Sequence, residues 1–416
     1  MTEPTPDGTA ARIAERAARL SYGKLVALLA ARTRDVAGAE DALSDALTRA
    51  LERWPRDGVP RNPEGWLLAV ARRAQIDGFR KAATVAASSA EFKLLLEERA
   101  DMPDEAFPDE RLKLLFVCAH PAIEARLHTP LMLQTVLGLD ARRIASAFLV
   151  APGTMGQRLT RAKAKIRNAG VRFEVPTRDS LAERVGGVLD AIYAAYTLGW
   201  DGAHGEDARA RSLAEESVWL GRLVAELIPG NPETAGLLAL MLFSEARSCA
   251  QREGATRTYV PLSEQNTALW SEPKLQEAED LLRRAGREGA AGRYQLEAAI
   301  QAVHVHRRVS GKTDWREIVL LYQGLLSVSP TLGAQIGYAA ALCESEGPAA
   351  ARTVLDAVSQ SSVAAYQPYW ATVAHVLAQL GDVSGAQAAY GSAAGLTEDA
   401  AVRAWLLARR ASLPQG

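Results

Sequence analysis

Apolar residues recur at spacings of three and four along almost the whole chain, which is the period of an α-helix with one buried face. The pattern predicts helices over Ala11–Thr33, Ala39–Trp54 and Glu64–Ala83, and strand-type alternation is nearly absent. In the second helix alanines, leucines and Trp54 share one face. The other face holds Glu40, Asp41, Ser44 and Asp45. These acidic positions suit either a helix N-terminus or an acidic docking surface.

A helix-turn-helix is predicted in the stretch Ala141–Arg172. The first helical pattern includes Ile144 and Phe148, and Val150–Gly153 then interrupts it. Proline disfavours helix in the residue before it, and glycine permits a tight turn. Thr154 is the expected N-cap of the second helix. The buried stripe of that helix is then Met155, Leu159, Ala162 and Ile166.

This stretch carries charge of one sign only. Between Ala141 and Phe173 there are eight basic residues and no Asp or Glu. A surface of this kind suits phosphate, and Gln157 and Arg158 occupy positions that meet base edges in such helices. A solvated basic face on a structural helix pair is the alternative. The basic residues are Arg142, Arg143, Arg158, Arg161, Lys163, Lys165, Arg167 and Arg172.

A second basic surface is predicted around the loop Pro55–Pro63. The loop contains Arg56 and Arg61. In the helix that follows, Trp66, Leu67, Val70, Ala71, Ile76 and Phe79 form the expected buried side. The same helix carries Arg72, Arg73, Arg80 and Lys81. Clustered arginines beside an aromatic helix can bind single-stranded nucleic acid, although Trp66 fits a core position better than a stacking platform.

The remainder of the chain is predicted to be helical throughout. Gly347 and Gly381 are 34 residues apart, the period of tetratricopeptide (TPR) helix pairs, and Leu377–Leu396 follows the pattern of that repeat. The expected helices are Leu181–Leu198, Ala208–Leu227, Thr234–Glu253, Lys274–Arg287, Tyr294–Arg307, Trp315–Leu326, Leu332–Ser345, Ala349–Val358, Ala364–Leu380, Ser384–Gly395 and Asp399–Arg410.

Composition divides the chain into two halves of opposite charge. Residues 1–176 carry 27 Lys and Arg against 22 Asp and Glu, a net of +5, whereas the rest carries 21 against 27, a net of −6. A basic half joined to an acidic half suggests a nucleic-acid-binding part and a part with another role. No apolar run reaches the length of a membrane span and the N-terminus lacks a signal-peptide pattern, so we expect a cytoplasmic protein.

The sequence gives no enzymatic or cofactor signal. The cysteines, Cys118, Cys249 and Cys343, are far apart and fit reduced thiols. Cys118 and His120 lack a second ligand pair at zinc spacing, and His304 and His306 point to different faces of a helix. Walker A, GxSxG and HExxH motifs are absent from the sequence. We therefore expect no catalytic residue, no metal and no cofactor.

Taken together, these stretches resemble RNA polymerase sigma factors of the extracytoplasmic-function (ECF) subfamily, in the group with a C-terminal TPR-like extension. The stretch AEDALSDALTRALERWP at 39–55 resembles sigma region 2.1–2.2, and NPEGWLLAVARRAQIDGFRK at 62–81 resembles regions 2.3–2.4. Pro108–Arg172 resembles region 4, with GTMGQRLTRAKAKI as its recognition helix. SEGPAAARTVLDAV, at 345–358, is similar to part of the extension.

The resemblance implies roles for each candidate surface. Glu40, Asp41, Ser44 and Asp45 would bind core RNA polymerase at the β′ clamp, and region 4 would meet the β flap. The promoter −10 element would meet Arg56, Arg61, Asn62, Trp66, Arg72, Arg73, Arg80 and Lys81. The −35 element would meet Arg142, Arg143, Thr154, Gln157, Arg158, Arg161 and Lys165. No membrane partner is implied. The acidic extension is expected to contact the sigma modules within the same chain.

The predicted fold is all-α and has three parts. We expect a disordered tail at 1–10, sigma region 2 at 11–83, a linker at 84–107, the region 4 helix-turn-helix at 108–175 and a TPR-like regulatory extension at 177–412. Two alternatives stay open. The chain could be a one-component transcriptional regulator with a helix-turn-helix and a repeat sensor, or a TPR scaffold anchored by its basic half.

Overall fold

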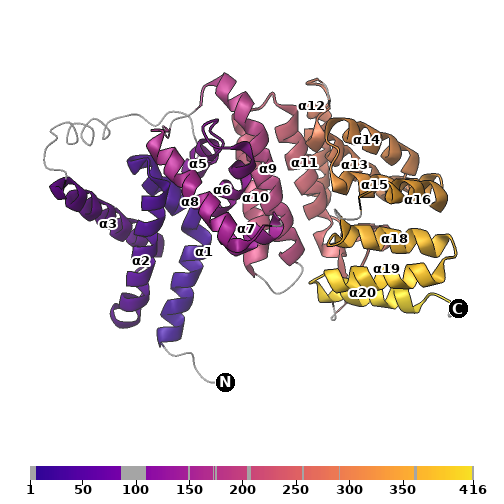
Figure 1. The fold of residues 1–416 in the computed structure, drawn as a ribbon, viewed down its shortest axis with the longest axis horizontal. Helices are drawn as coiled ribbons and strands as arrows, with labels where there is room; N and C mark the ends of the chain where they lie inside the picture. Colours follow the sequence, from indigo (N-terminus) through magenta and orange to yellow (C-terminus); the bar gives the residue numbers. More distant parts are fainter. Residues whose placement is uncertain are drawn as a thin grey trace. The chain divides into compact units, whose positions relative to one another are not determined.

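The computed structural model describes residues 6–85, 109–148, 150–171, 173, 176–203, 208–254, 257–289, 291–359 and 363–414. The fold is all-α, as predicted, and its contacts divide it into two compact units (Figure 1). Unit 1 comprises Met1–Gly199 with Ala208–Leu223, and unit 2 comprises Trp200–Asp207 with Val224–Gly416. The predicted linker at 84–107 lies outside the described residues except for its first two positions, which end a helix.

Unit 1 begins with three helices that pack on one another: α1 (Pro6–Thr33), α2 (Val36–Asp57) and α3 (Pro63–Val85). Helix α1 starts inside the predicted tail. Asp35 caps α2 by accepting a 3.1 Å hydrogen bond from the backbone N–H of Gly38, because the first N–H groups of a helix lack partners within it. Pro55, expected to begin a loop, lies in the last turn of α2, and Gly58 ends that helix with φ +82°.

Among the described side chains, the buried faces of these helices follow the predicted period with two exceptions; Phe79, also predicted to be buried, lies outside the described side chains. Ala39, Ala46 and Ala50 of α2 are fully buried, and so are Leu67 and Ala71 of α3. Leu51 and Ile76, which were expected on the buried side, are 51% and 50% exposed. Both predictions were wrong because the apolar stripe in the sequence is wider than the face that a neighbouring helix covers.

Four further helices follow in unit 1: α5 (Glu110–Cys118), α6 (Ala125–Thr135), α7 (Ala141–Ala147) and α8 (Pro152–Asn168). A short turn joins α7 to α8, and the two helices pack together over α6. Ile144, Met155, Leu159 and Ile166 are buried at this junction, which confirms the stripe predicted for α8. The packing of α7 on α8 therefore follows directly from the apolar spacing.

The predicted N-cap of α8 was wrong. Helix α8 begins at Pro152 with Ala151 as its N-cap, so Thr154 already lies within the first turn and is exposed. Proline suits the first helical position, because its ring fixes a helical φ and its missing N–H would have had no partner there. Both Thr154 and Pro152 are residues that favour the start of a helix, and Pro152, two residues earlier, is the one at which α8 begins.

Two long helices extend unit 1 beyond the predicted boundary at residue 176: α9 (Arg178–Ala203) and the first part of α10 (Ala208–Leu227). Arg111 of α5 forms a 2.6 Å ion pair with Glu216 of α10, and its guanidinium lies 4.2 Å from the centre of the Trp219 ring. Arg184 of α9 donates to the backbone carbonyl of Phe116. Helices α9 and α10 are therefore attached to α5.

Unit 2 is a succession of packed helices after α11 (Pro232–Ala246). The helix expected over Thr234–Glu253 ends at Ala246, and a short antiparallel pair, β1 (Arg252–Glu253) and β2 (Thr258–Tyr259), follows it. No described helix has the length and apolar character to cross a membrane. The remaining helices are α12 (Glu272–Ala285), α13 (Arg293–Ser310), α14 (Trp315–Val328), α15 (Leu332–Ser345), α16 (Pro348–Asp356), α18 (Gln367–Gln379), α19 (Val383–Leu396) and α20 (Ala400–Ala411).

The two glycines of the predicted repeat occupy equivalent turns. Gly347 joins α15 to α16 with φ +100°, and Gly381 precedes α19 with φ +80°. Glycine adopts positive φ without the strain that a Cβ would cause. The pairs α15–α16 and α18–α19 are thus two helical hairpins with matching turns, and Figure 1 shows α18, α19 and α20 side by side.

Candidate nucleic-acid interface

Helix α8 carries an open basic face. Thr154, Arg158, Arg161 and Lys165 follow one another at spacings of four, three and four, so they share one side of the helix. Arg158 is half-buried and the other three are exposed, as is Gln157. Within the described part of the chain, no carboxylate forms an ion pair with Arg158, Arg161 or Lys165. This face therefore presents positive charge that is not neutralised locally.

A second basic stripe of α8 is already occupied by α2. Lys163 Nζ lies 2.5 Å from Glu40 Oε2, and both side chains are largely buried, at 10% and 15% exposure. Arg167 Nη1 lies 3.6 Å from Asp35 Oδ2. Lys163 was counted among surface cations in the sequence, and that prediction was wrong because the residue lies on the side that packs against α2. Only part of the basic stretch is available to nucleic acid.

Glu40 is therefore not on the open side of α2. Burial raises the pKa of the Glu40 carboxyl, while the ammonium of Lys163 acts in the opposite direction. The phenol of Tyr22 also hydrogen-bonds Glu40, and burial beside this carboxyl raises the pKa of Tyr22. Among the candidate polymerase-binding residues, Asp41, Ser44 and Asp45 remain exposed. They form a continuous polar strip along one side of α2.

Helix α7 places the two remaining arginines of the helix-turn-helix at its start. The backbone N–H groups of Arg142 and Arg143 each donate a 2.9 Å hydrogen bond to Asp140 Oδ1. The Arg142 side chain is exposed and that of Arg143 is half-buried. Asp140 thus fixes the helix start and leaves the Arg142 side chain open to solvent.

The loop between α2 and α3 presents polar side chains to solvent. Arg56, Arg61 and Asn62 are exposed, and Asn62 Oδ1 caps α3 by accepting a 3.0 Å hydrogen bond from the N–H of Gly65. The Trp66 ring is half-buried and meets the Trp54 ring edge-on, with centroids 5.5 Å apart. The Trp66 ring therefore takes part in packing, while its contact with the −10 element stays a prediction.

Two of the four basic residues assigned to α3 have described side chains. Arg73 is exposed and Arg72 is half-buried. The side chains of Arg80 and Lys81, both assigned to the −10 surface, lie outside the described residues. The described part of this surface consists of the α2–α3 loop and the first half of α3.

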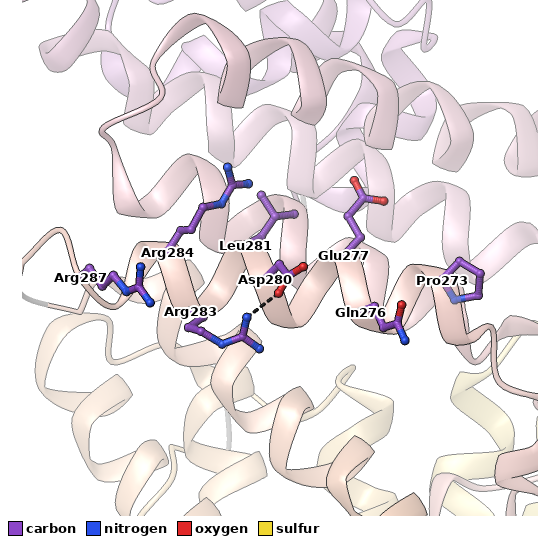
Figure 2. A pocket seen from close by; sticks show the side chains of 8 residues that line it. All are labelled: Pro273, Gln276, Glu277, Asp280, Leu281, Arg283, Arg284 and Arg287. Atoms are coloured by element: carbon purple, nitrogen blue, oxygen red, sulfur yellow. Dashed lines mark hydrogen bonds and ion pairs between the residues drawn. The ribbon is translucent and has the colours of Figure 1, made fainter.

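A hollow of about 640 Å³ in unit 2 lies along α12 (Figure 2). Its described lining comes from that helix and from Arg287, just after the end of the helix, and Arg283 forms an ion pair with Asp280 within it. Positive and negative side chains are mixed and do not converge on one point, as they would around a bound substrate. The lining residues are Pro273, Gln276, Glu277, Asp280, Leu281, Arg283, Arg284 and Arg287.

Two families match parts of the chain. Residues 18–84, which form most of α1 and nearly all of α2 and α3, match Sigma-70 region 2. Residues 184–286, from α9 to α12, match a family of unknown function, DUF6596. This second match begins in unit 1 and ends in unit 2.

The chain is also similar to a protein from Rhizobium meliloti (strain 1021), Uncharacterized protein R00370. The two are 37% identical over 374 residues, which cover 88% of each chain. No solved structure matches the chain. The chain therefore belongs to the same family as this Rhizobium meliloti protein, and residues 18–84 of the chain match Sigma-70 region 2.

Proposed function

We propose that this protein is an ECF-type sigma factor that binds core RNA polymerase and directs promoter-specific initiation under the control of its own C-terminal, TPR-like helical region. The observation that carries the proposal is the region 2 match, which coincides with the three packed helices α1, α2 and α3. The open basic face of α8 adds a second surface suited to DNA. A one-component regulator would need only that second surface.

Each surface has a separate task in this proposal. The strip Asp41–Asp45 docks on the β′ clamp, while the α2–α3 loop and the start of α3 engage the opened −10 element. The side of α8 that carries Arg158, Arg161 and Lys165 engages the −35 element, because the N-terminal part of such a helix enters the major groove. Initiation then needs no catalytic residue or cofactor from this chain, since polymerase performs the chemistry.

Helices α9 and α10 support the proposed control by the C-terminal region. They continue into unit 2 and yet belong largely to unit 1, where Glu216 and Trp219 hold Arg111 of α5. Glu216 is largely buried, and burial raises its pKa while Arg111 opposes that shift. In this proposal a change that alters α9 or α10 acts on α5 through the contacts of Arg111.

Transcription with purified components tests the proposal. Core polymerase, the full chain and a genomic promoter library should give RNA from a limited set of start sites that core polymerase alone does not use. RNA synthesis that does not change on adding the protein would contradict the sigma assignment. DNA binding that does not need core polymerase would favour the one-component regulator instead.

Reversing the exposed acidic strip should weaken polymerase binding. The double variant Asp41→Lys/Asp45→Lys is expected to lose at least about tenfold in affinity for core polymerase, because charge complementarity at a docking surface turns into repulsion. Both side chains are exposed, so stability should change by less than about 0.5 kcal/mol. Fluorescence titration of labelled protein with core polymerase measures the affinity.

The matched control is Glu52→Lys/Asp57→Lys, which reverses two exposed charges at the other end of the same helix. It should retain most of the affinity. Equal losses in both double variants would show a general effect of net charge and would remove the assignment of Asp41 and Asp45.

Arg158→Ala and Lys165→Ala should have different effects on promoter binding. If Arg158 reads a base edge, its loss should weaken the preferred promoter by about 1–3 kcal/mol and relax selectivity at one base pair. Lys165→Ala should weaken all sequences alike, as expected for a phosphate contact. Binding of the holoenzyme to promoter variants with single substitutions in the −35 element measures both effects.

Arg126→Ala is the control for lost positive charge, because Arg126 is exposed on α6 and pairs with Glu124. It should leave promoter selectivity unchanged. Full selectivity in the Arg158→Ala variant would mean that a different part of the chain reads the −35 element.

A further inference from the structure

Four side chains capable of binding a metal meet between α15 and α18 in unit 2. Cys343 and Glu344 come from the last turn of α15, while His375 and Gln379 lie one turn apart on α18. His375 Nε2 is 3.0 Å from Glu344 Oε1 and 2.9 Å from Gln379 Nε2. Cys343 Sγ is 3.6 Å from Gln379 Oε1. One ligand atom each from Cys343, Glu344 and His375 lies within 4.8 Å of the others.

We propose that Cys343, Glu344 and His375 form a binding site for a transition-metal ion, with Zn²⁺ as the ion that suits them best. Sulfur, imidazole nitrogen and carboxylate oxygen are the donors that zinc takes in proteins, whereas calcium and magnesium prefer oxygen alone. Three protein ligands leave a fourth position for water or for the amide oxygen of Gln379.

The geometry needs only a small adjustment to hold an ion. Metal–ligand bonds of about 2.0–2.3 Å place the ligands of a tetrahedral zinc ion about 3.5 Å apart. The three atoms lie within 4.8 Å of one another, so each separation must change by about 1.3 Å at most. The side chains of Glu344 and His375 are 37% and 47% exposed and can rotate to do so. Cys343 is buried, so its sulfur is the least mobile of the three ligand atoms.

This arrangement also gives the ion a structural effect. Cys343 and Glu344 are separated from His375 by more than thirty residues and reach it only because α15 packs on α18. A bound ion would join the two hairpins α15–α16 and α18–α19. Because it binds the folded form and not the separated helices, it should stabilise unit 2. The thiol loses its proton as the metal binds, so affinity should rise with pH.

Metal titration of the full chain tests the site, after reduction and removal of metal with a chelator. Zn²⁺ is titrated in competition with a chromophoric chelator, and Co²⁺ is added separately to detect thiolate-to-metal charge-transfer absorption. We expect one tightly bound equivalent and a thiolate band. Cys343→Ser should abolish the band, and Glu344→Gln and His375→Ala should each weaken Zn²⁺ binding by about tenfold or more.

Cys249→Ser and His306→Ala are the matched controls, since both residues are exposed in unit 2 and lie on other elements. They should leave the band and the affinity unchanged. The proposal is overturned if the wild-type chain binds no tight equivalent, or if the band survives Cys343→Ser. Circular dichroism confirms that each variant is folded, and Glu344→Gln keeps the test decisive if Cys343→Ser unfolds. The test does not depend on polymerase binding, so it can fail while the proposed function stands.

Discussion

Replacing Gly23 by alanine is expected to destabilise unit 1 by about 3 kcal/mol. A Cβ at this position of α1 would lie 1.7 Å from the carbonyl oxygen of Val136 and 2.7 Å from its carbonyl carbon. Both are backbone atoms in the turn that ends α6, so no side-chain rotation can make room. Helix α1 would have to move away from the end of α6, which would also disturb its packing on α5.

The matched control is Gly186→Ala on α9, in the same unit. A Cβ there meets no atom within 4 Å, so the variant should be neutral or gain about 0.5–1 kcal/mol through lower flexibility of the unfolded chain. Because two units can unfold separately, a single melting midpoint is not sufficient. Hydrogen exchange of backbone amides in α1 and α6 measures the effect locally. Equal protection in the two variants would contradict the close approach of Gly23 to Val136.

The sequence predicted the elements that depend on local spacing. The stripe Met155–Ile166 is buried as its period requires, and the half-buried Trp66 packs against Trp54. The glycines at 347 and 381 were predicted to mark a repeat, and both adopt positive φ at equivalent turns. Each of these features is decided by residues within one or two helical turns, which is the range over which a sequence pattern carries information.

The contacts that the sequence analysis did not predict join residues that are far apart in the sequence. Lys163 lies in a stretch without acidic residues and was therefore placed on the surface, yet its partner Glu40 is 123 positions away. No local pattern distinguishes it from Lys165, which is exposed. The same holds for Cys343 and His375, which only the packing of α15 on α18 brings together. The packing of α9 and α10 with unit 1 could likewise not be predicted from their sequence, and their assignment to the extension stays a prediction.

Lys163→Met is expected to destabilise unit 1 by about 3 kcal/mol at neutral pH. The change leaves the Glu40 carboxylate largely buried without the cation that neutralises it, and removing one partner of a buried pair is strongly unfavourable. The double variant Glu40→Gln/Lys163→Met has no buried charge at either position and should recover most of the loss. Hydrogen exchange of amides in α2 and α8 reports on both variants.

The pH dependence of the single variant identifies Glu40 as the cause. Burial raises the pKa of Glu40 in the folded protein above that of a glutamate in the unfolded chain, and losing Lys163 raises it further. The ionised carboxylate is therefore the form that folding disfavours. The destabilisation should be complete above the raised folded-state pKa, and it should fade as pH falls through that value towards the unfolded one.

Measurements at about pH 8 and about pH 5 should thus show a large difference between Lys163→Met and the wild type at the higher pH and a smaller one at the lower. The double variant should show no such convergence, because glutamine does not titrate. A loss that is the same at both pH values would mean that Lys163 acts through the packing of its side chain. In that case the contact between α2 and α8 would not depend on the charge of Glu40.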